Sequence, residues 1–284
     1  MSFSGGKDST VLKHIIDGMG LDIPAVFVDT GLEYPEIRKF VQAVKNGEYS
    51  QFNANVEIVK PELRFDEVVE KYGYPVPTKQ VADVIEGARR NPNSTRMRRL
   101  NGQFGGRLDG RPSKFDCPQW KFLLDAPFKI SAKCCDVMKK KPLHVYQKKT
   151  KRAPIIGVLA TESEVRKREW LKTGCNAFSR GGSSRPLSFW TEDDILQYIH
   201  DYDVPYASVY GGIVKGDDGH WHTTGCDRTG CMFCMFGVHL EKGMNRFQKM
   251  KETHPKQYAY CMRPRSENGL GLKEVLDFIH VKSE

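Results

Sequence analysis

The spacing of hydrophobic residues in the first 60 positions alternates between two periods. Apolar side chains recur at helical spacing over residues 11–19 and again over 35–47, while short β-branched runs at 25–29 and 56–59 predict strands. An order of helix, strand, helix, strand is typical of βαβ units. The amino-terminal part therefore predicts an α/β fold with a parallel sheet.

The middle of the chain predicts further helices around one irregular stretch. Two helices are predicted within residues 64–90, and a basic helix over 163–172 follows an apolar strand at 155–159. Residues 91–116 are rich in Gly, Arg and Asn and show no periodicity. We expect them to form a mobile loop or lid, part of a basic loop over 89–116.

The carboxyl-terminal third begins with a clear helix start. Thr191 is a predicted N-cap, and Asp194 stands at the third helical position. Residues 203–243 are irregular and rich in Gly, Tyr and Cys, and two helices are predicted near 245–260 and 271–280. We expect an α/β domain over residues 1–200, followed by a cysteine-rich and helical region over 201–284.

Composition excludes several classes of protein. Of the 284 residues 39% are hydrophobic, enough for a core, yet no apolar run approaches the roughly 20 residues of a membrane helix. The first residues, MSFSGGKDST, lack the basic and apolar regions of an export signal, so we expect a cytoplasmic protein. A membrane span, a collagen-like chain and an intrinsically disordered chain are excluded.

The net charge of +9 is concentrated in two stretches. Residues 89–114 carry eight Arg and Lys against one acid, and residues 133–152 carry eight against one. The rest of the chain is therefore net −5. A local basic surface predicts a polyanionic partner such as nucleic acid, or a phosphate-rich ligand. Two solvated faces of Lys and Arg are the alternative.

The segment directly before the first helix has the composition of an anion-binding loop. It reads Ser4-Gly5-Gly6-Lys7-Asp8-Ser9-Thr10. The glycines let the backbone approach an anion, consecutive N–H groups form a nest, and the helix N-terminus and Lys7 add positive charge. The pattern differs from GxxxxGK[ST], which disfavours a Walker-type NTPase. A pyrophosphate or sulfate group is therefore predicted to bind here, an ordinary glycine turn being the alternative.

These residues resemble the PP-loop of the adenine-nucleotide α-hydrolase-like superfamily, and the chain resembles its phosphoadenosine phosphosulfate (PAPS) reductase branch. Residues 29–31, DTG, are similar to a triplet that this branch carries near the nucleotide. Residues 157–166, GVLATESEVR, resemble its G-x-R-A-x-E-S-x-x-R element, and residues 186–206 resemble its PLxxWTxxD stretch. The resemblance extends from residue 2 to about 240.

The resemblance implies a doubly wound parallel sheet of the PP-loop type with a C-terminal helical, cysteine-rich appendage. It also implies an adenine nucleotide as ligand: ATP with Mg²⁺, or adenylyl sulfate or PAPS. The implied nucleotide-binding residues are Ser4, Gly5, Gly6, Lys7, Asp8, Ser9, Thr10, Asp29, Thr30, Gly31 and Ser163. The implied catalytic residues are Lys7, Asp8, Glu162 and Arg166. A helix-capping role for Glu162 and a plain surface charge for Arg166 are the structural alternatives.

Eight cysteines in a chain without an export signal favour a metal or redox site over a disulfide framework. Cys134-Cys135 followed by Cys231-x-x-Cys234 resembles the pair and the CxxC motif with which assimilatory adenylyl-sulfate reductases bind an iron–sulfur cluster. The resemblance implies a 4Fe–4S cluster on these four residues. A zinc site on the same ligands and a thiol redox pair without metal are the alternatives.

A second set of cysteine ligands is also possible. Cys226 stands five residues before the CxxC motif and makes a three-ligand run with it, which Cys175 or Cys261 could complete. This arrangement resembles that of iron–sulfur proteins of DNA phosphorothioation in the same branch. The sequence leaves both sets open.

Two features depart from the resemblance. Sulfonucleotide reductases end in a Glu-Cys-Gly-Leu-His type of segment whose cysteine attacks the sulfate sulfur, whereas residues 267–272 read ENGLGL, with Asn268 in place of that cysteine. This disfavours reduction through a covalent thiosulfonate, and Cys261 is a poor substitute. The family also has a full central strand before the loop, whereas only three residues precede Ser4, so we expect either an upstream start or a gap in the sheet.

Three functions remain. The first is an ATP-dependent enzyme that adenylates an acceptor and transfers sulfur with help from the cluster, with a sulfur or electron donor protein as its partner. The second is a sulfonucleotide reductase that releases sulfite. The third is a nucleotide-binding iron–sulfur or zinc protein without catalytic activity.

Overall fold

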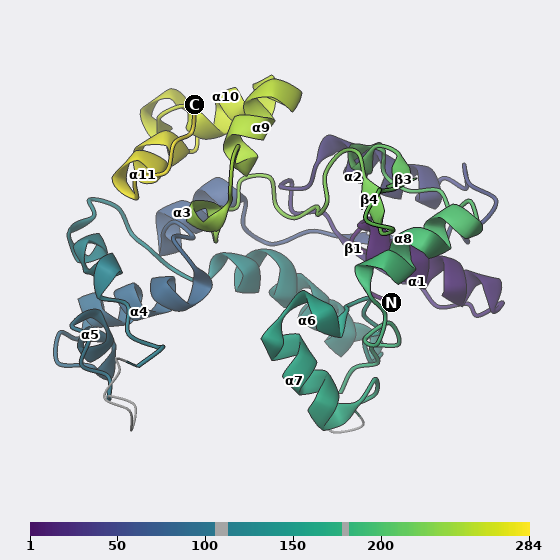
Figure 1. The fold of residues 1–284 in the computed structure, drawn as a ribbon, viewed down its shortest axis with the longest axis horizontal. Helices are drawn as coiled ribbons and strands as arrows, with labels where there is room; N and C mark the ends of the chain where they lie inside the picture. Colours follow the sequence, from purple (N-terminus) through teal and green to yellow (C-terminus); the bar gives the residue numbers. More distant parts are fainter. Residues whose placement is uncertain (106–112, 178–181) are drawn as a thin grey trace. The chain divides into compact units, whose positions relative to one another are not determined.

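The computed structural model describes residues 1–105, 113–177 and 182–284 (Figure 1). Contacts between Cα atoms divide the chain into two compact units. The first unit joins Met1–Pro61 to Lys139–Cys231, and the second unit joins Glu62–Met138 to Met232–Glu284. The sequence predicted one boundary at residue 200, because the order of elements along the chain does not show that the chain leaves the first unit after Pro61 and returns to it at Lys139.

The first unit is built on a small parallel sheet. β1 (Ala25–Val28) pairs in parallel with β2 (Val56–Val59), and Ala25 lies opposite Val56. Ser2 forms parallel bridges to Val26 on one side and to Ile156 on the other. The predicted α/β fold with a parallel sheet is therefore confirmed, and its doubly wound order stays a prediction.

The central position of this sheet is occupied by residues 1–3. Ser2 N–H donates to Ile155 O at 2.8 Å, and Phe3 N–H donates to Val26 O at 2.9 Å. The side chain of Phe3 is 1% exposed and belongs to the apolar core of the first unit. The anion loop thus begins directly at the end of a paired, buried segment, where the sequence analysis allowed for a gap.

The strand predicted over 155–159 is shorter than expected. Only Ile155 and Ile156 form bridges, and a 3₁₀ turn follows at Ala160–Glu162. A Cβ atom on Gly157 would lie 3.0 Å from Asp8 O, so from this residue onward the chain packs against the anion loop. The run of apolar residues predicted a longer strand, because a sequence pattern contains no information about this close approach of two backbone segments.

Helices surround the sheet of the first unit. They are α1 (Lys7–Gly18), α2 (Pro35–Lys45), α6 (Lys141–Thr150), α7 (Glu164–Thr173) and α8 (Glu192–Asp201). α1 packs against α8, α2 against β2, and α6 against both strands (Figure 1). The Thr191 hydroxyl accepts from Asp194 N–H at 3.2 Å, which confirms the predicted N-cap. α6 was not predicted, because its apolar positions are few.

The region 203–243 contains regular structure that the sequence did not predict. β3 (Ile213–Lys215) and β4 (Trp221–Thr223) pair antiparallel, with Val214 opposite His222. Each strand has only three residues and is largely exposed, so it carries no clear alternation of apolar and polar side chains. Contacts across the hairpin, rather than local pattern, define it.

The described part of the second unit is helical. Its helices are α3 (Phe65–Tyr72), α4 (Lys79–Arg90), α5 (Thr95–Leu100), α9 (Arg246–Thr253), α10 (Pro255–Met262) and α11 (Leu272–Phe278). The aperiodic loop predicted over 91–116 is wrong at α5, whose Leu100 is fully buried. The single helix predicted over 245–260 is wrong as well, since Pro255 begins a new helix after His254.

No helix in the described ranges is long and apolar enough to cross a membrane.

Candidate functional site

The loop Ser4–Ser9 and the N-terminus of α1 form the predicted anion-binding element. Gly5 has a φ of +70°, and a Cβ atom there would lie 2.7 Å from Val41 Cγ2, so only glycine fits. The Ser9 hydroxyl accepts from Ser4 N–H at 3.1 Å and donates to Gly6 O at 2.9 Å. The loop is therefore held in shape by its own side chains.

The N–H groups of the first turn of α1 point out of the helix end. The first intrahelical bond runs from Thr10 N–H to Gly6 O at 3.0 Å, so the N–H groups of Lys7, Asp8 and Ser9 have no intrahelical partner. No side chain caps the helix at Gly6. Backbone donors and the helix dipole together favour an anion at this end of α1.

A hollow of about 310 Å³ lies over this loop, within the first unit. The predicted residues that line it are Ser4, Gly6, Lys7, Asp8, Ser9, Glu162 and Arg166. Residues that the sequence analysis did not assign complete the lining, among them Lys139, Glu192, Tyr210, Arg228 and Thr229. The structure therefore brings the predicted loop and the predicted 162–166 segment together at one site.

Acidic and basic side chains alternate around this hollow. Lys7 Nζ lies 3.0 Å from Asp8 Oδ1 and 3.2 Å from Glu192 Oε1. Arg228 lies 3.6 Å from Glu192 Oε2 and 3.7 Å from Glu162 Oε1. Arg166 also pairs with Glu162. These acids hold the three cations around the hollow, where an incoming anion can compete for them.

Burial and neighbouring charges set the protonation of the two central cations. Burial lowers the pKa of Lys7, but the carboxylates of Asp8 and Glu192 more than offset this, so its pKa lies above the ordinary value. Burial lowers the pKa of Arg166, and Arg228 adds to this effect, while Asp8 opposes it. Lys7 is therefore a firmly protonated ammonium at neutral pH.

Tyr210 and Thr229 form a hydroxyl pair against the loop. Tyr210 Oη accepts from Lys7 N–H at 3.2 Å and lies 2.6 Å from Thr229 Oγ1. Burial raises the pKa of Tyr210, so this phenol stays protonated. No sequence motif marks Tyr210, which is 203 positions away from Lys7. Arg228 and Thr229 precede the CxxC motif by a few residues, and that motif could have drawn attention to them.

The triplet Asp29–Gly31 does not line this hollow. Asp29 Oδ2 lies 3.0 Å from Arg38 Nη2, and Asp29 Oδ1 accepts from Gly31 N–H at 3.3 Å. The Thr30 hydroxyl donates to Glu33 Oε1 at 2.7 Å. A neighbouring hollow of about 110 Å³ at the end of β1 is lined by Glu33 and by Ser4, so the triplet supports the wall of that space.

Glu162 and Ser163 hold the start of α7. Ser163 is the N-cap and accepts from Arg166 N–H at 3.2 Å, while Glu162 Oε2 accepts from Leu159 N–H at 3.1 Å. Ser163 does not line the hollow, so its capping role accounts for its position. Thr10 lies on the buried side of α1, and its hydroxyl has no hydrogen-bond partner in the described residues.

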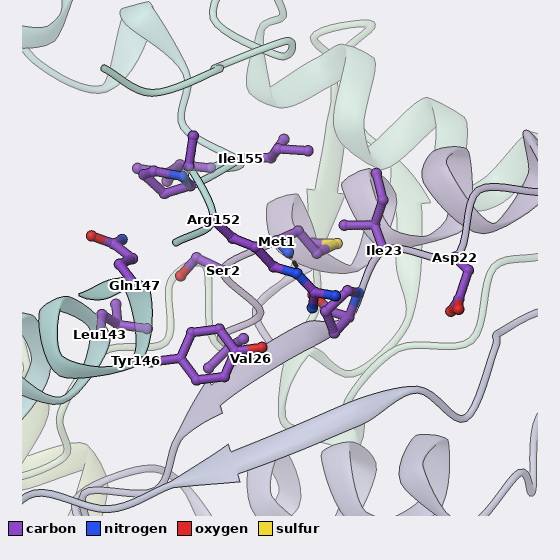
Figure 2. A pocket seen from close by; sticks show the side chains of 14 residues that line it. Met1, Ser2, Asp22, Ile23, Val26, Leu143, Tyr146, Gln147, Arg152 and Ile155 are labelled. Carbon is purple, nitrogen blue, oxygen red and sulfur yellow. Dashed lines mark hydrogen bonds between the residues drawn. The ribbon is translucent and has the colours of Figure 1, made fainter. Parts of the chain in front are cut away.

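A second hollow of about 340 Å³ is lined by residues 1–2 and by one face of α6 (Figure 2). Leu143, Tyr146 and Gln147 of α6 face it, opposite Met1 and Ile23. Its lining is mainly apolar. The face of α6 that carries Leu143, Tyr146 and Gln147 is therefore the one turned toward the sheet.

The predicted cluster ligands are distributed over both units. Cys134, Cys135 and Cys234 belong to the second unit, and Cys231 is the last residue of the first. Cys134 is buried, and the other three are half-buried. Across residues 1–105, 113–177 and 182–284, no three His, Cys, Asp or Glu side chains come together as metal ligands. The ligand set stays a prediction from the sequence.

Cys261 is a poor nucleophile in this structure. Its side chain is fully buried, and its thiol donates to Tyr258 O at 3.3 Å. Burial raises the pKa of the thiol to about 12, so the reactive thiolate is scarce at neutral pH. Asn268, in the place of the expected cysteine, adopts a left-handed conformation with φ +59° after a short 3₁₀ turn.

Three arginines of the basic loop 89–116 are engaged within the second unit. The guanidinium of Arg89 donates to the backbone carbonyls of residues 123, 124, 126 and 128 at 2.7–3.2 Å. Arg90 pairs with Glu86 at 2.9 Å, and Arg96 pairs with Asp83 at 3.0 Å. Arg107, Asp109 and Arg111 lie outside the described residues. Within the described residues, Arg90 and Arg96 are therefore paired with acids, and Arg89 has a structural role.

The family profile of the phosphoadenosine phosphosulfate reductase domain matches residues 1–100 and 116–236. The chain belongs to this family. The match includes the anion loop, the 157–166 segment and the CxxC motif, which agrees with the resemblance found in the sequence.

Two similar proteins of this PAPS reductase family chain come from an archaeon and have no assigned function in their names. An uncharacterized protein of Methanocaldococcus jannaschii, MJ0973, is 24% identical over 258 residues, covering 90% of this chain and 45% of its own length. A second, MJ0066, is 40% identical over 79 residues, covering 26% of this chain and 15% of its own length. The chain thus spans less than half of either protein.

Another similar protein carries the name of an enzyme. The adenosine 5′-phosphosulfate reductase of Staphylococcus haemolyticus is 25% identical over 233 residues, covering 79% of this chain and 67% of its own length. Among solved structures, the phosphate complex of PAPS reductase from Candida auris aligns with a TM-score of 0.39 and 16% identity, covering 73% of this chain and 75% of its own. So low a TM-score carries no inference about activity.

Proposed function

We propose that this protein binds an adenine nucleotide with its phosphates over the loop Ser4–Ser9 and adenylates an acceptor at the expense of ATP. The single observation that carries the proposal is the hollow at the N-terminus of α1, where Lys7, Arg166 and Arg228 converge. The N–H groups of Asp8 and Ser9 at the start of α1, together with three cations, suit a polyphosphate better than one singly charged group. Membership of the PAPS reductase family supports an adenine nucleotide as the ligand.

The proposed reaction needs the charge of a leaving pyrophosphate to be stabilised. An acceptor atom attacks the α-phosphorus of ATP, the bond from that phosphorus to the bridging oxygen breaks, and pyrophosphate leaves with the electron pair. The Lys7 ammonium and the N–H groups of Asp8 and Ser9 are placed to bind this leaving group, because they are fixed before the reaction begins. Arg166 and Arg228 neutralise the remaining phosphate oxygens.

Carboxylates at the same hollow fit a Mg²⁺ ion that accompanies ATP. Mg²⁺ is commonly bound by one or two carboxylates together with substrate phosphates, and Asp8 and Glu192 are the carboxylates nearest Lys7. The ion would neutralise phosphate charge. Asp8 and Glu192 also orient the Lys7 ammonium.

Reduction of adenylyl sulfate or PAPS is the second candidate function. The Staphylococcus haemolyticus relative, named as an adenosine 5′-phosphosulfate reductase, favours it. The usual route needs a cysteine that attacks the sulfate sulfur, and two observations weigh against it here. Asn268 replaces that cysteine, and Cys261 is buried with a raised pKa.

Product analysis separates the two functions. We expect the protein to release pyrophosphate from ATP when sulfate or RNA is supplied as acceptor, and to release no sulfite from adenylyl sulfate or PAPS in the presence of a dithiol. Sulfite release would overturn the proposal in favour of the reductase. Nucleotide binding without either product would overturn both and leave a non-catalytic nucleotide-binding protein.

The iron–sulfur cluster is supported by cysteine spacing alone, and no catalytic step is derived through it. We expect about four irons and four sulfides per chain after anaerobic purification. Cys231→Ser and Cys234→Ser should each lower the iron content, whereas Cys117→Ser is the matched control outside the predicted ligand set. One zinc per chain, or no metal, would contradict this prediction, and Cys226→Ser and Cys175→Ser test the second ligand set.

A further inference from the structure

The sequence around α6 contains basic residues without any acid to balance them. Residues 137–161 include Lys148, Lys149, Lys151 and Arg152 and no Asp or Glu. The first lysines of the run, 139–141, precede and begin the helix. Such a charge distribution repels protein cations and attracts polyanions.

The structure shows how α6 is turned relative to the sheet. Leu143, Tyr146 and Gln147 face the hollow beside residues 1–2 (Figure 2), and Tyr146 Oη donates to Glu57 Oε1 of β2 at 2.5 Å. Helical spacing therefore places Lys148 and Lys149, together with Val145 (53% exposed), on the outward side. Apolar contacts hold the inner face, and the outer face is left basic.

The outward lysines have no acidic neighbours to neutralise them. Lys148, Lys149 and Lys151 are exposed, and none of them makes an ion pair with any residue that the structure describes. Two acids lie on the inner side of α6: Glu57, which Tyr146 engages, and Asp22, which lines the same hollow. The arginines of 89–96 differ from these lysines, since Arg89, Arg90 and Arg96 are engaged within the second unit.

The basic run is continuous with the candidate active site. Lys139, at its beginning, lines the hollow over the anion loop, and α6 continues from there for ten residues. Ten helical residues span about 15 Å, which is long enough to lie beside more than one backbone phosphate of a nucleic-acid strand. A polyanion that lies along this face therefore has its end near the loop Ser4–Ser9.

We infer that the outer face of α6 binds the phosphate backbone of a single-stranded nucleic acid and leads it to the hollow over the anion loop. Repeated phosphates match repeated lysines, and an unpaired strand presents its bases to a pocket without the cost of opening a duplex. The idea that this strand is the acceptor rests on the proposed adenylation, whereas its binding to α6 does not.

The test is the salt dependence of RNA binding by the full chain. The probe is a fluorescein-labelled, mixed-sequence RNA of twenty nucleotides, titrated between 50 and 200 mM KCl and followed by anisotropy. The triple variant Lys148→Ala/Lys149→Ala/Lys151→Ala should weaken binding at 50 mM at least 10-fold and reduce the log–log salt slope by about 2, that is about 0.7 per lost contact. Lys39→Ala/Lys45→Ala/Lys60→Ala, three exposed lysines of the same unit, is the matched control and should bind like the wild type.

Several outcomes would overturn the inference. Wild-type protein that does not bind the RNA, or a triple variant that binds it like the wild type, would do so. Polyglutamate that displaces the RNA with equal potency would show that the face takes any polyanion, an acidic protein included. RNA binding is measured without ATP and pyrophosphate release is a separate readout, so failure of the proposed function and failure of this inference give different results.

Discussion

Replacing Asp17 with alanine should lower the free energy of unfolding by about 3–5 kcal/mol, the usual cost of removing one partner of a buried ion pair. Lys13 Nζ lies 2.7 Å from Asp17 Oδ2, and the two side chains are 1% and 5% exposed. The same carboxylate oxygen accepts from Asn53 N–H at 2.9 Å. Without it, the Lys13 ammonium stays in the core beside Phe52 with no compensating charge.

The measurement is urea unfolding followed by circular dichroism, and the chain supplies a matched control. Lys273 and Asp277 form a pair with the same spacing at 3.0 Å, but both side chains are about half exposed. Asp277→Ala should therefore change stability by less than about 1 kcal/mol. The double variant Lys13→Met/Asp17→Leu should recover much of the loss, since an apolar pair removes the buried charge. Equal effects of Asp17→Ala and Asp277→Ala would refute this reading of the pair.

Replacing Lys7 with alanine should lower nucleotide turnover by about 100- to 1,000-fold, the range seen when one preorganised donor to a developing charge is removed. The Lys7 ammonium is held between Asp8 and Glu192, and its side chain is 7% exposed. Its loss removes a cation and leaves two carboxylates that repel an incoming phosphate. The wild-type turnover that serves as reference is the pyrophosphate release expected under the proposed function.

Two comparisons make this result specific. Lys45→Ala, at the exposed last turn of α2, removes the same charge away from the hollow and should leave turnover unchanged. Thermal unfolding of Lys7→Ala should show a folded protein, and calorimetry with ATP should show the accompanying loss of affinity. Full activity of folded Lys7→Ala would remove the loop Ser4–Ser9 from the proposed site.

Some of the site was predictable because its signals are local. The glycines and serines of the loop, the helix that begins at Lys7, and the cap at Thr191 each depend on residues within a few positions of one another. The 157–166 segment was assigned by resemblance, and the hollow over the loop does include Glu162 and Arg166. Their chemical roles stay proposals.

Local pattern failed where a tertiary contact or a single backbone constraint decided the outcome. α5 forms in an arginine-rich stretch without apolar periodicity, because the burial of a single side chain, Leu100, stabilises this short helix. The helix predicted over 245–260 is divided because Pro255 lacks the N–H that would continue it. Arg89, part of the basic segment 89–114 for which a polyanionic partner stays a prediction, donates to backbone carbonyls between residues 123 and 128, a contact that no local pattern records.

The sequence by itself determined the anion loop, the parallel arrangement of the amino-terminal elements and the family, because each of these is encoded by neighbouring residues. Only the tertiary structure decided which charges meet at the loop. Tyr210 contacts Lys7 across 203 positions. Arg228 pairs with Glu162 and Glu192, although in the sequence its segment attracted attention only because of the nearby cysteines. Such pairs depend on chain folding over long separations, which no periodicity records, and the same is true of the face that α6 turns toward solvent.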